Sequence, residues 1–245
     1  MDERGPVALV TGGGGGLGRA VGLRLREAGA SVALLGRTPA SVAAAAEALG
    51  ALGVTADVTR RDAVERAVRT VGEDLGPVRW LVNAAGIAEA SPLLPPDDAL
   101  WEHTLAVNTT GAWIVSTAVL PGMLTAGGGA IVNVASTAAL KGYRYTAAYV
   151  TSKHALLGLT RALAEELRSK CVRVSAVCPG FLDTEMTDRT IARIVKTTGQ
   201  SEADARSVLA GMNASKRLVS ADEVAVAILD LLRDEGRRDE VVTIE

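Results

Sequence analysis

Residues 7–29 read VALVTGGGGGLGRAVGLRLREAG, and this stretch decides which fold to expect. Residues 7–10 are an apolar run typical of a buried strand, and residues 18–29 have the periodicity of an amphipathic helix. Between them, Thr11 to Gly18 is almost entirely glycine, so the backbone can turn sharply and approach a pyrophosphate. Free amides at the start of a helix stabilise negative charge. Consecutive glycines alone could form a flexible loop, but between a strand and a helix they predict a dinucleotide-binding site.

The same alternation of strand and helix continues along the chain. Stretches with helical periodicity, such as residues 61–72 and 153–170, separate short apolar runs. Strands that are apolar on both faces need helices on both faces. We therefore expect an α/β fold, a single-domain Rossmann-like doubly wound parallel sheet of about seven strands. The expected strands are residues 7–10, 31–35, 53–57, 80–85, 130–136, 172–178 and 240–245.

No internal repeat or linker divides residues 1–245, so we expect one domain. Residues 181–219 form the one long stretch without a predicted strand. Within it, residues 190–212 resemble two short amphipathic helices, and Ser201 followed by Asp204 is a candidate helix cap. Because this stretch follows the carboxyl end of a strand, we interpret it as a lid that covers the substrate. Additional packing is the alternative.

The overall charge excludes some classes of partner. There are 26 Lys and Arg residues against 28 Asp and Glu, a formal net charge of -2, which gives no long-range attraction to nucleic acid or an anionic membrane. No apolar run approaches the length of a membrane span. Residues 1–6 (MDERGP) lead into no apolar signal stretch, so we expect a cytoplasmic protein without nucleic-acid or membrane partners.

The cysteines and histidines predict neither a disulfide nor a metal site. Cys171 and Cys178 fall in one predicted strand, where seven residues at about 3.3 Å each separate them by roughly 23 Å. This distance is far beyond disulfide reach. His103 and His154 have no cysteine or carboxylate at ligand spacing, so we expect no metal.

Several motifs follow one another in a fixed order. They are T-G-x-x-x-G-x-G at residues 11–18, Asn83-Ala-Ala-Gly86, Asn108 in VNTTG, Ser136 at the end of the fifth predicted strand, Tyr149-x-x-x-Lys153, and Pro179-Gly180 after the sixth. Together they resemble the classical short-chain dehydrogenase/reductase family over essentially the whole chain. The resemblance implies an oxidoreductase that binds a nicotinamide dinucleotide and assembles as a homodimer or homotetramer, through the helices around residues 101–123 and 149–170. Sequence alone would allow a monomer.

The resemblance also implies which residues contact the cofactor. Asp57 and Val58 resemble the pair that contacts adenine. The implied cofactor-binding residues are Gly12, Gly15, Gly16, Leu17, Gly18, Arg37, Asp57, Val58, Asn83, Ala84, Gly86, Tyr149, Lys153, Pro179, Gly180, Leu182 and Thr184.

Tyr149 and Lys153 predict acid–base chemistry from their spacing alone. At positions i and i+4 of a helix they project from one face. A free tyrosine has a pKa of about 10, so its surroundings must lower the pKa by about three units, or about 4 kcal/mol, for work near neutrality. A lysine ammonium one turn away, helped by the positive charge of an oxidised nicotinamide, acts in that direction. An ordinary pair on a helix surface is the alternative.

Ser136 and Asn108 complete the predicted catalytic set. The Ser136 hydroxyl can donate a hydrogen bond to a developing alkoxide. For Asn108, the family resemblance implies that it holds a water in a proton relay ending at Lys153. The ordinary alternatives are a turn cap for Ser136 and a satisfied core amide for Asn108. Tyr143, Tyr145 and Trp101 could line the substrate cleft or fill the core.

The end of the second predicted strand favours NADP(H) over NAD(H). NAD-dependent enzymes usually hold the ribose hydroxyls with a carboxylate there. Here the position is Gly36, followed by Arg37, with no acid beside it in sequence. A guanidinium binds a 2'-phosphate well. Residues 13–15 of the glycine loop supply no second basic group.

We therefore expect hydride transfer between a nicotinamide and a ketone or secondary alcohol. The leading substrate is a 3-oxoacyl or 3-hydroxyacyl thioester. Reductases of carrier-bound chains often have a basic residue before the fifth strand, and residues 125–129 (TAGGG) have none, so a coenzyme A ester or a small cyclic ketone is an equal candidate. A regulator that senses NADP(H) without turnover is the competing class, but such proteins typically lose the tyrosine or lysine that this chain keeps.

Overall fold

The computed structural model describes residues 5–237 and 239–245. Within them, seven parallel strands form one sheet in the order β3-β2-β1-β4-β5-β6-β7. The strands are β1 Val7–Thr11, β2 Ser31–Gly36, β3 Leu52–Thr55, β4 Val78–Asn83, β5 Gly129–Val134, β6 Val172–Pro179 and β7 Val241–Ile244. The predicted strands and the Rossmann-like doubly wound sheet are thus confirmed. Three strand ends were predicted two residues too late, because β3, β4 and β5 stop at Thr55, Asn83 and Val134. Ser136 therefore lies two residues beyond β5.

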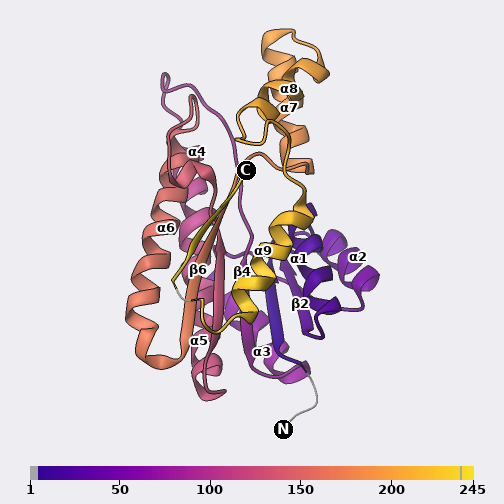
Figure 1. Ribbon diagram of the computed structural model, residues 1–245, viewed down its shortest axis with the longest axis vertical. Coiled ribbons are helices and arrows are strands. Elements are labelled where there is room, and N and C mark those ends of the chain that lie inside the picture. Colours follow the sequence, from indigo (N-terminus) through magenta and orange to yellow (C-terminus); the bar gives the residue numbers. More distant parts are fainter. Residues whose placement is uncertain (1–4, 238) are drawn as a thin grey trace.

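Helices cover both faces of the sheet, as the apolar strands require (Figure 1). Helices α3, α5 and α6 pack on one face, while α1, α2 and α9 pack on the other. The helices are α1 Gly16–Glu27, α2 Pro39–Leu49, α3 Arg61–Asp74, α4 Asp98–Leu105, α5 Gly111–Thr125, α6 Ala147–Leu167, α7 Glu185–Thr198, α8 Glu202–Gly211 and α9 Ala221–Arg233. None of the described helices is long and apolar enough to cross a membrane.

The strand order reverses between β1 and β4, because β2 and β3 extend the sheet to one side and β4 to β7 extend it to the other. The chain after β1 continues into α1 on one face of the sheet, and the chain after β4 leads to α5 on the other face. Ligands of doubly wound sheets bind at this switch point. The fold thus places the glycine loop and the residues after β4 at this switch point.

Two short irregular helical segments lie near this edge. The π-helical turn η1, Ala106–Thr110, joins α4 to α5 and contains Asn108. The single 3-10 turn η2, Thr137–Ala139, follows Ser136. π-helical turns of this kind occur frequently at functional sites.

The two predicted helices of residues 181–219 are confirmed as α7 and α8 (Figure 1). Ser201 caps α8, since its hydroxyl accepts a hydrogen bond from the Asp204 amide. The pair has its own apolar centre, made of Ile191, Ala205 and Leu209. The ends of the segment are joined by a parallel bridge between Leu182 and Val219. This module therefore stands above the sheet as a unit, and its action as a lid stays a prediction.

Candidate active site

In the glycine loop, residues 11–18, the backbone packs closely against the start of α1. Gly12 has a φ of +69°, a conformation that residues with a side chain rarely adopt. A Cβ atom on Gly18 would lie 2.3 Å from the carbonyl oxygen of Gly12, so only glycine lets α1 start this close to the loop. Helix α1 begins at Gly16 with Gly15 as its N-cap, and no side chain caps it. The first amides of α1 are therefore available for an anion.

Thr184 lies opposite this helix start. A Cβ atom on Gly16 would be 3.5 Å from the Thr184 methyl group, so two residues far apart in sequence and both predicted to bind cofactor lie together. Arg19 adds a contact that the sequence analysis missed, because it donates to the Gly14 carbonyl at 3.0 Å and to Glu185 at 2.7 Å. The uncapped helix start and the small residues around it fit a pyrophosphate.

Thr11 is a second residue that the sequence analysis missed as part of the site. Its hydroxyl accepts hydrogen bonds from the amides of Ala84 and Ala85, both at 3.0 Å. The first residue of the glycine motif thus fixes the course of the chain after β4. The signal that could have found it is its place in the T-G motif at the end of a strand beside β4.

The side chain of Asn83 makes its hydrogen bonds inside the protein. Its Nδ2 donates to Ser116 at 3.1 Å and to Asn133 at 2.9 Å, and the residue is 3% exposed. Its Oδ1 finds no hydrogen-bond partner within the described residues. A contact between Asn83 and cofactor therefore stays a prediction for the backbone, and Ala84 and Gly86 continue the same edge.

The adenosine end of the expected cofactor site contains both a cation and an acid. Arg37 is exposed just beyond β2. Burial acts to raise the pKa of Asp57, but hydrogen bonds from Thr59 and the charges of Arg37 and His103 hold it below its usual value. The sequence showed no acid next to Arg37, whereas the structure places Asp57 near enough to interact with its charge. Asp57 therefore already neutralises part of the Arg37 charge, and a bound 2'-phosphate would share that charge with Asp57.

The predicted cofactor residues at the other strand ends are Leu17 after β1, Val58 after β3, and Pro179, Gly180 and Leu182 at or beyond the end of β6. Val58 is buried against Gly111 of α5, and Leu17 packs with the α1 side of the core. Gly180 donates its amide to Ile244 of β7 and approaches the Asn213 side chain so closely that a Cβ atom would lie 2.2 Å from its oxygen. Their contacts to a cofactor stay predictions.

Lys153 and Tyr149 lie on α6 at the carboxyl edge of the sheet. The Lys153 ammonium donates to the Val134 carbonyl at 2.9 Å and lies 5.7 Å from the centre of the Tyr149 ring. Lys153 is 5% exposed, and burial lowers its pKa to about 8. A Cβ atom on Gly86 would be 3.6 Å from the ammonium, so the segment after β4 meets the catalytic helix here. The ordinary reading of a solvated helix pair does not fit a buried lysine.

The pKa of Tyr149 is raised in the protein alone, whereas the sequence analysis expected its surroundings to lower it. In the protein alone burial raises the pKa of this phenol, while hydrogen bonding by Ser136 acts to lower it. Tyr143 and Cys178 also face the group and favour its neutral form. The lowering that catalysis needs therefore depends on a positive charge next to the phenol, and its supply by bound oxidised nicotinamide stays a prediction.

Ser136 fills the ordinary role of a turn cap, while donation to a developing alkoxide stays a prediction. It is the cap of η2, because its hydroxyl oxygen accepts from the Ala138 amide at 3.1 Å. Accepting this bond leaves the hydroxyl proton available to be donated elsewhere. The same hydroxyl acts on Tyr149. The residue that caps η2 therefore also places a hydrogen-bond donor beside Tyr149.

Asn108 is buried, and both ends of its side-chain amide make hydrogen bonds. Its Oδ1 accepts from the Ile87 amide at 2.8 Å, and its Nδ2 donates to the Ile87 carbonyl and to Ser152, both at 2.9 Å. The side chain therefore joins the segment after β4 to α6. A water held by Asn108 in a relay stays a prediction.

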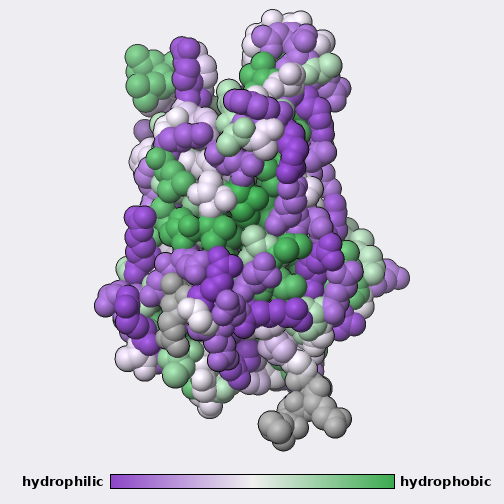
Figure 2. Space-filling view, in the orientation of Figure 1, coloured by the Kyte–Doolittle hydropathy of each residue, from purple (hydrophilic) through white to green (hydrophobic). Residues whose placement is uncertain are grey.

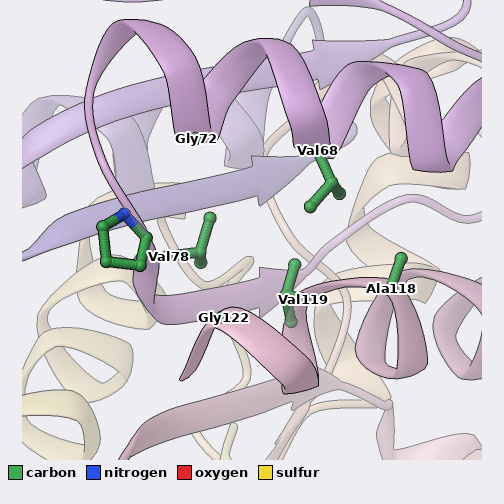
Figure 3. Close-up of a pocket in the computed structure, with 7 residues that line it drawn as sticks. Val68, Gly72, Val78, Ala118, Val119 and Gly122 are labelled. Carbon is green, nitrogen blue, oxygen red and sulfur yellow. The ribbon is translucent and has the colours of Figure 1, made fainter. Parts of the chain in front are cut away.

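An apolar cavity of about 250 Å³ lies elsewhere, between α3 and α5 (Figure 3). Val68, Val78 and Val119 point into it. Its other lining residues, Gly72, Pro77, Ala118 and Gly122, are also without ionisable groups. Val78 begins β4 and Pro77 precedes it, so the cavity lies at the amino edge of the sheet and away from Tyr149. Among the described residues, no cluster of three potential metal ligands was found.

Comparison with known proteins gives concordant results. The family model for short chain dehydrogenases matches residues 6–194. A 3beta-hydroxysteroid dehydrogenase of Mediterraneibacter gnavus is 34% identical, covering 97% of this chain and 91% of its own length. An acetoacetyl-CoA reductase of Allochromatium vinosum is also 34% identical, covering 94% of this chain and 92% of its own.

Among solved structures, a variant of actinorhodin polyketide ketoreductase crystallised with NADPH superposes with a TM-score of 0.94. It is 32% identical, and the match covers 98% of this chain and 95% of that one. The sheet order, the glycine loop and the acid–base pair described above thus occur in a chain that is similar in sequence and fold to reductases and dehydrogenases over nearly its whole length.

Proposed function

The chain belongs to the short-chain dehydrogenase family and is an oxidoreductase acting on CH–OH groups, and on that premise we propose that it interconverts a 3-oxoacyl thioester and its 3-hydroxy form. The observation that carries the chemistry is the convergence of Ser136, Tyr149 and buried Lys153 at the carboxyl edge of β5, beside the segment that the glycine loop holds. Two elements, α6 and the turn after β5, supply one acid–base site.

Each residue has a role that follows from its place. When bound, the nicotinamide supplies or accepts the hydride. Tyr149 gives its phenol proton to the carbonyl oxygen during reduction, or takes the proton during oxidation. Ser136 donates a hydrogen bond to the same oxygen as negative charge develops on it. Lys153 stabilises the phenolate with its charge and binds the ribose, and Asn108 holds the segment around Ile87 in place for both.

Similarity to an acetoacetyl-CoA reductase supports the thioester as substrate. Two cations, Lys141 and Arg144, are exposed on the loop between η2 and α6. They would bind the phosphates of a coenzyme A ester near the mouth of the site. Leu93 and Leu94 are 78% and 79% exposed on the segment that leads away from Gly86. These leucines would contact an apolar chain.

The second candidate is a cyclic or steroid alcohol. Similarity to a 3beta-hydroxysteroid dehydrogenase favours it, and the exposed leucines would contact a ring system equally well. For the cofactor we propose NADP(H) over NAD(H). Arg37 beyond β2, and the resemblance to a ketoreductase crystallised with NADPH, support this preference.

The deciding experiment is a screen of purified protein against acetoacetyl-CoA, cyclohexanone derivatives and 3-oxosteroids, each with NADPH and with NADH. We expect kcat/KM to be highest for acetoacetyl-CoA with NADPH. A higher kcat/KM for a steroid or small cyclic ketone would replace the thioester by the second candidate. Equal values with the two nucleotides would contradict the cofactor preference.

A further inference from the structure

Ser152 stands between Tyr149 and Lys153 on α6, is 0% exposed, and has no part in the roles described above. We propose that Ser152 is a positioning residue, which holds the Tyr149 backbone against Asn108 and so fixes where the phenol lies relative to Ser136 and Lys153. The inference rests on the proposed function, because it concerns the geometry of the same acid–base site. Three hydrogen bonds meet at this one serine.

The direction of the hydrogen bonds follows from their donors. The Ile87 amide can only donate, so the Asn108 atom that meets it is the oxygen, Oδ1. The other amide atom is then the nitrogen, which can only donate, so the Ser152 hydroxyl must accept from it at 2.9 Å. The single hydroxyl proton is thereby free to be donated to the Tyr149 carbonyl, at 2.7 Å. The chain of bonds runs one way, from Asn108 through Ser152 to Tyr149.

A second bond holds the same residue to the π-helical turn. The hydroxyl of Thr109 donates to the Ser152 carbonyl at 2.9 Å. Successive residues of η1 thus bind the side chain and the backbone of Ser152. Tyr149 lies in the first turn of α6, so no preceding helical turn holds it in place. These hydrogen bonds therefore determine the position of that turn at the edge of the sheet.

The position of the Tyr149 phenol affects the rate of the proposed reaction, because a displaced phenol transfers its proton more slowly. Misplacement of a reacting group by about 1 Å can cost about 100-fold in rate. The ionisable groups that face Tyr149 are Lys153 on the same helix, Tyr143 on the preceding loop and Cys178 at the end of β6. A turn that shifts away from Ser136 and Lys153 would lose the partners that stabilise the phenolate.

The chain offers a matched control on the same helix. Thr160 is 2% exposed, and its hydroxyl accepts from the Asn133 amide at 2.9 Å and donates to the Leu156 carbonyl at 2.8 Å. This is the same arrangement, an asparagine amide bonded to a hydroxyl that is bonded to a helix carbonyl. The carbonyl belongs to a residue away from the acid–base pair. Removing either hydroxyl leaves one buried amide hydrogen unpaired.

The experiment compares Ser152→Ala and Thr160→Val with wild type in kcat, KM for NADPH, the pH profile of kcat and thermal unfolding. We expect Ser152→Ala to lose about 10-fold or more in kcat and to move the limb of the pH profile upward by at least about half a unit. Thr160→Val should lose a similar amount of stability while its kcat and pH profile stay near wild type. If Ser152→Ala does not fold, Ser152→Cys, nearly equal in size, is measured against the same criteria.

The proposal is overturned if Ser152→Ala matches Thr160→Val in kcat and pH profile, since the serine then only stabilises the helix. Turnover of no substrate by wild type would contradict the proposed function instead. Titration of the phenol then decides the positioning role without turnover. The chain has three tyrosines, so subtracting the absorbance titration of Tyr149→Phe isolates Tyr149. Ser152→Ala should raise this pKa, and an unchanged value would refute the proposal.

Discussion

Burial shifts the pKa values of Tyr149 and Lys153 in opposite directions. It raises the pKa of the Tyr149 phenol and lowers the pKa of the Lys153 ammonium to about 8, because a low-dielectric site favours the neutral form of each. The Lys153 ammonium keeps one hydrogen bond to protein, to the Val134 carbonyl. Within the described residues no second hydrogen bond of this ammonium is seen, and we expect its other donors to reach the ribose of a cofactor. We therefore expect a bound nucleotide to complete the site with its own charge and hydroxyls.

Tyr149→Phe should remove proton transfer and little else. The ring and its packing stay, so we expect kcat to fall by about 100-fold or more, the usual scale for a general acid or base. The dissociation constant for NADPH, measured by fluorescence titration, should change little. A mutant that keeps more than about a tenth of wild-type kcat would contradict the assignment of Tyr149.

Lys153→Met should abolish turnover and yet stabilise the fold at neutral pH. The pKa of Lys153 is about 8 in the folded protein against 10.5 normally, so the unfolded chain binds the proton more tightly. Its charge therefore lowers stability below pH 8, and this cost is relieved as the pH rises from about 8 towards 10.5. The shift corresponds to roughly 3 kcal/mol, partly offset by about 1 kcal/mol for the lost bond to Val134.

Urea unfolding of wild type and Lys153→Met at pH 7 and pH 10 checks the sign. The methionine variant should be more stable at pH 7 by at least about 1 kcal/mol, and the difference should shrink at pH 10. An advantage that grows with pH would show that burial does not lower the pKa of Lys153.

Arg37→Ala tests the nucleotide preference. A charge-assisted hydrogen bond to a 2'-phosphate is worth about 1.5 to 3 kcal/mol, so the dissociation constant for NADPH should rise roughly 10-fold to 150-fold. Binding of NADH should stay nearly unchanged. Arg60→Ala is the control, because Arg60 is exposed beyond the next strand and pairs with Asp62. Equal weakening of both nucleotides by Arg37→Ala would make it an ordinary surface arginine.

At the scale of elements, the segment 181–219 is closed on itself at its base. Asn213 is 1% exposed, and its side chain accepts from the Phe181 amide at 2.8 Å and donates to the carbonyls of Phe181 at 2.9 Å and Arg217 at 2.7 Å. One amide thus joins the outgoing and returning ends of the segment. Arg206 of α8 adds ion pairs to Asp183 and to Asp188 of α7. These contacts hold α7 and α8 as one body above the site.

Asn213→Ala should loosen this segment without unfolding the sheet. Each buried backbone group left unpaired costs about 1 to 3 kcal/mol, and the cost falls on a module with its own apolar centre. We expect faster limited proteolysis within residues 181–219 and a higher KM for substrate, with kcat changed less. Gln200→Ala, in the exposed turn between α7 and α8, should behave as wild type. Unchanged proteolysis would show that Asn213 does not hold the base closed.

At the scale of the whole molecule, two apolar surfaces lie outside the site. Trp101 of α4 and Trp113 of α5 are 40% and 42% exposed. Figure 2 shows hydrophobic side chains gathered over β7, between α6 and α9. Val226 of α9, 41% exposed, lies on the helix beside this region, and β7 pairs only with β6 among the described strands. Exposed aromatic residues and an open strand edge are common features of subunit contacts.

We expect the protein to form a homodimer or homotetramer, with α4, α5 and α6 in one contact. Trp113→Glu should weaken this contact, because burying an unpaired carboxylate between subunits is costly. Light scattering after size-exclusion chromatography should then give a smaller mass than wild type, and circular dichroism should show an intact fold. A monomeric wild type would contradict the expectation, and an unchanged mass for Trp113→Glu would place the contact elsewhere.

The sequence by itself determined the doubly wound sheet and the glycine loop, and it singled out Tyr149 and Lys153 as the predicted acid–base residues. It could do so because each rests on local spacing: strand and helix periods, glycines between a strand and a helix, and Tyr149 one turn before Lys153. The paired helices of residues 190–212 followed from the same periodicity. These features need no knowledge of what packs against them.

Tertiary structure alone decided the surroundings of those residues. Burial set the direction of the pKa shifts of Tyr149 and Lys153, and contacts between distant segments brought Thr11 to Ala84 and Thr184 to Gly16. Spacing along the chain carries no information about which partners a fold brings together, because those contacts depend on how separate elements cross. For the same reason only the folded chain shows Ser152 held between Asn108 and Tyr149.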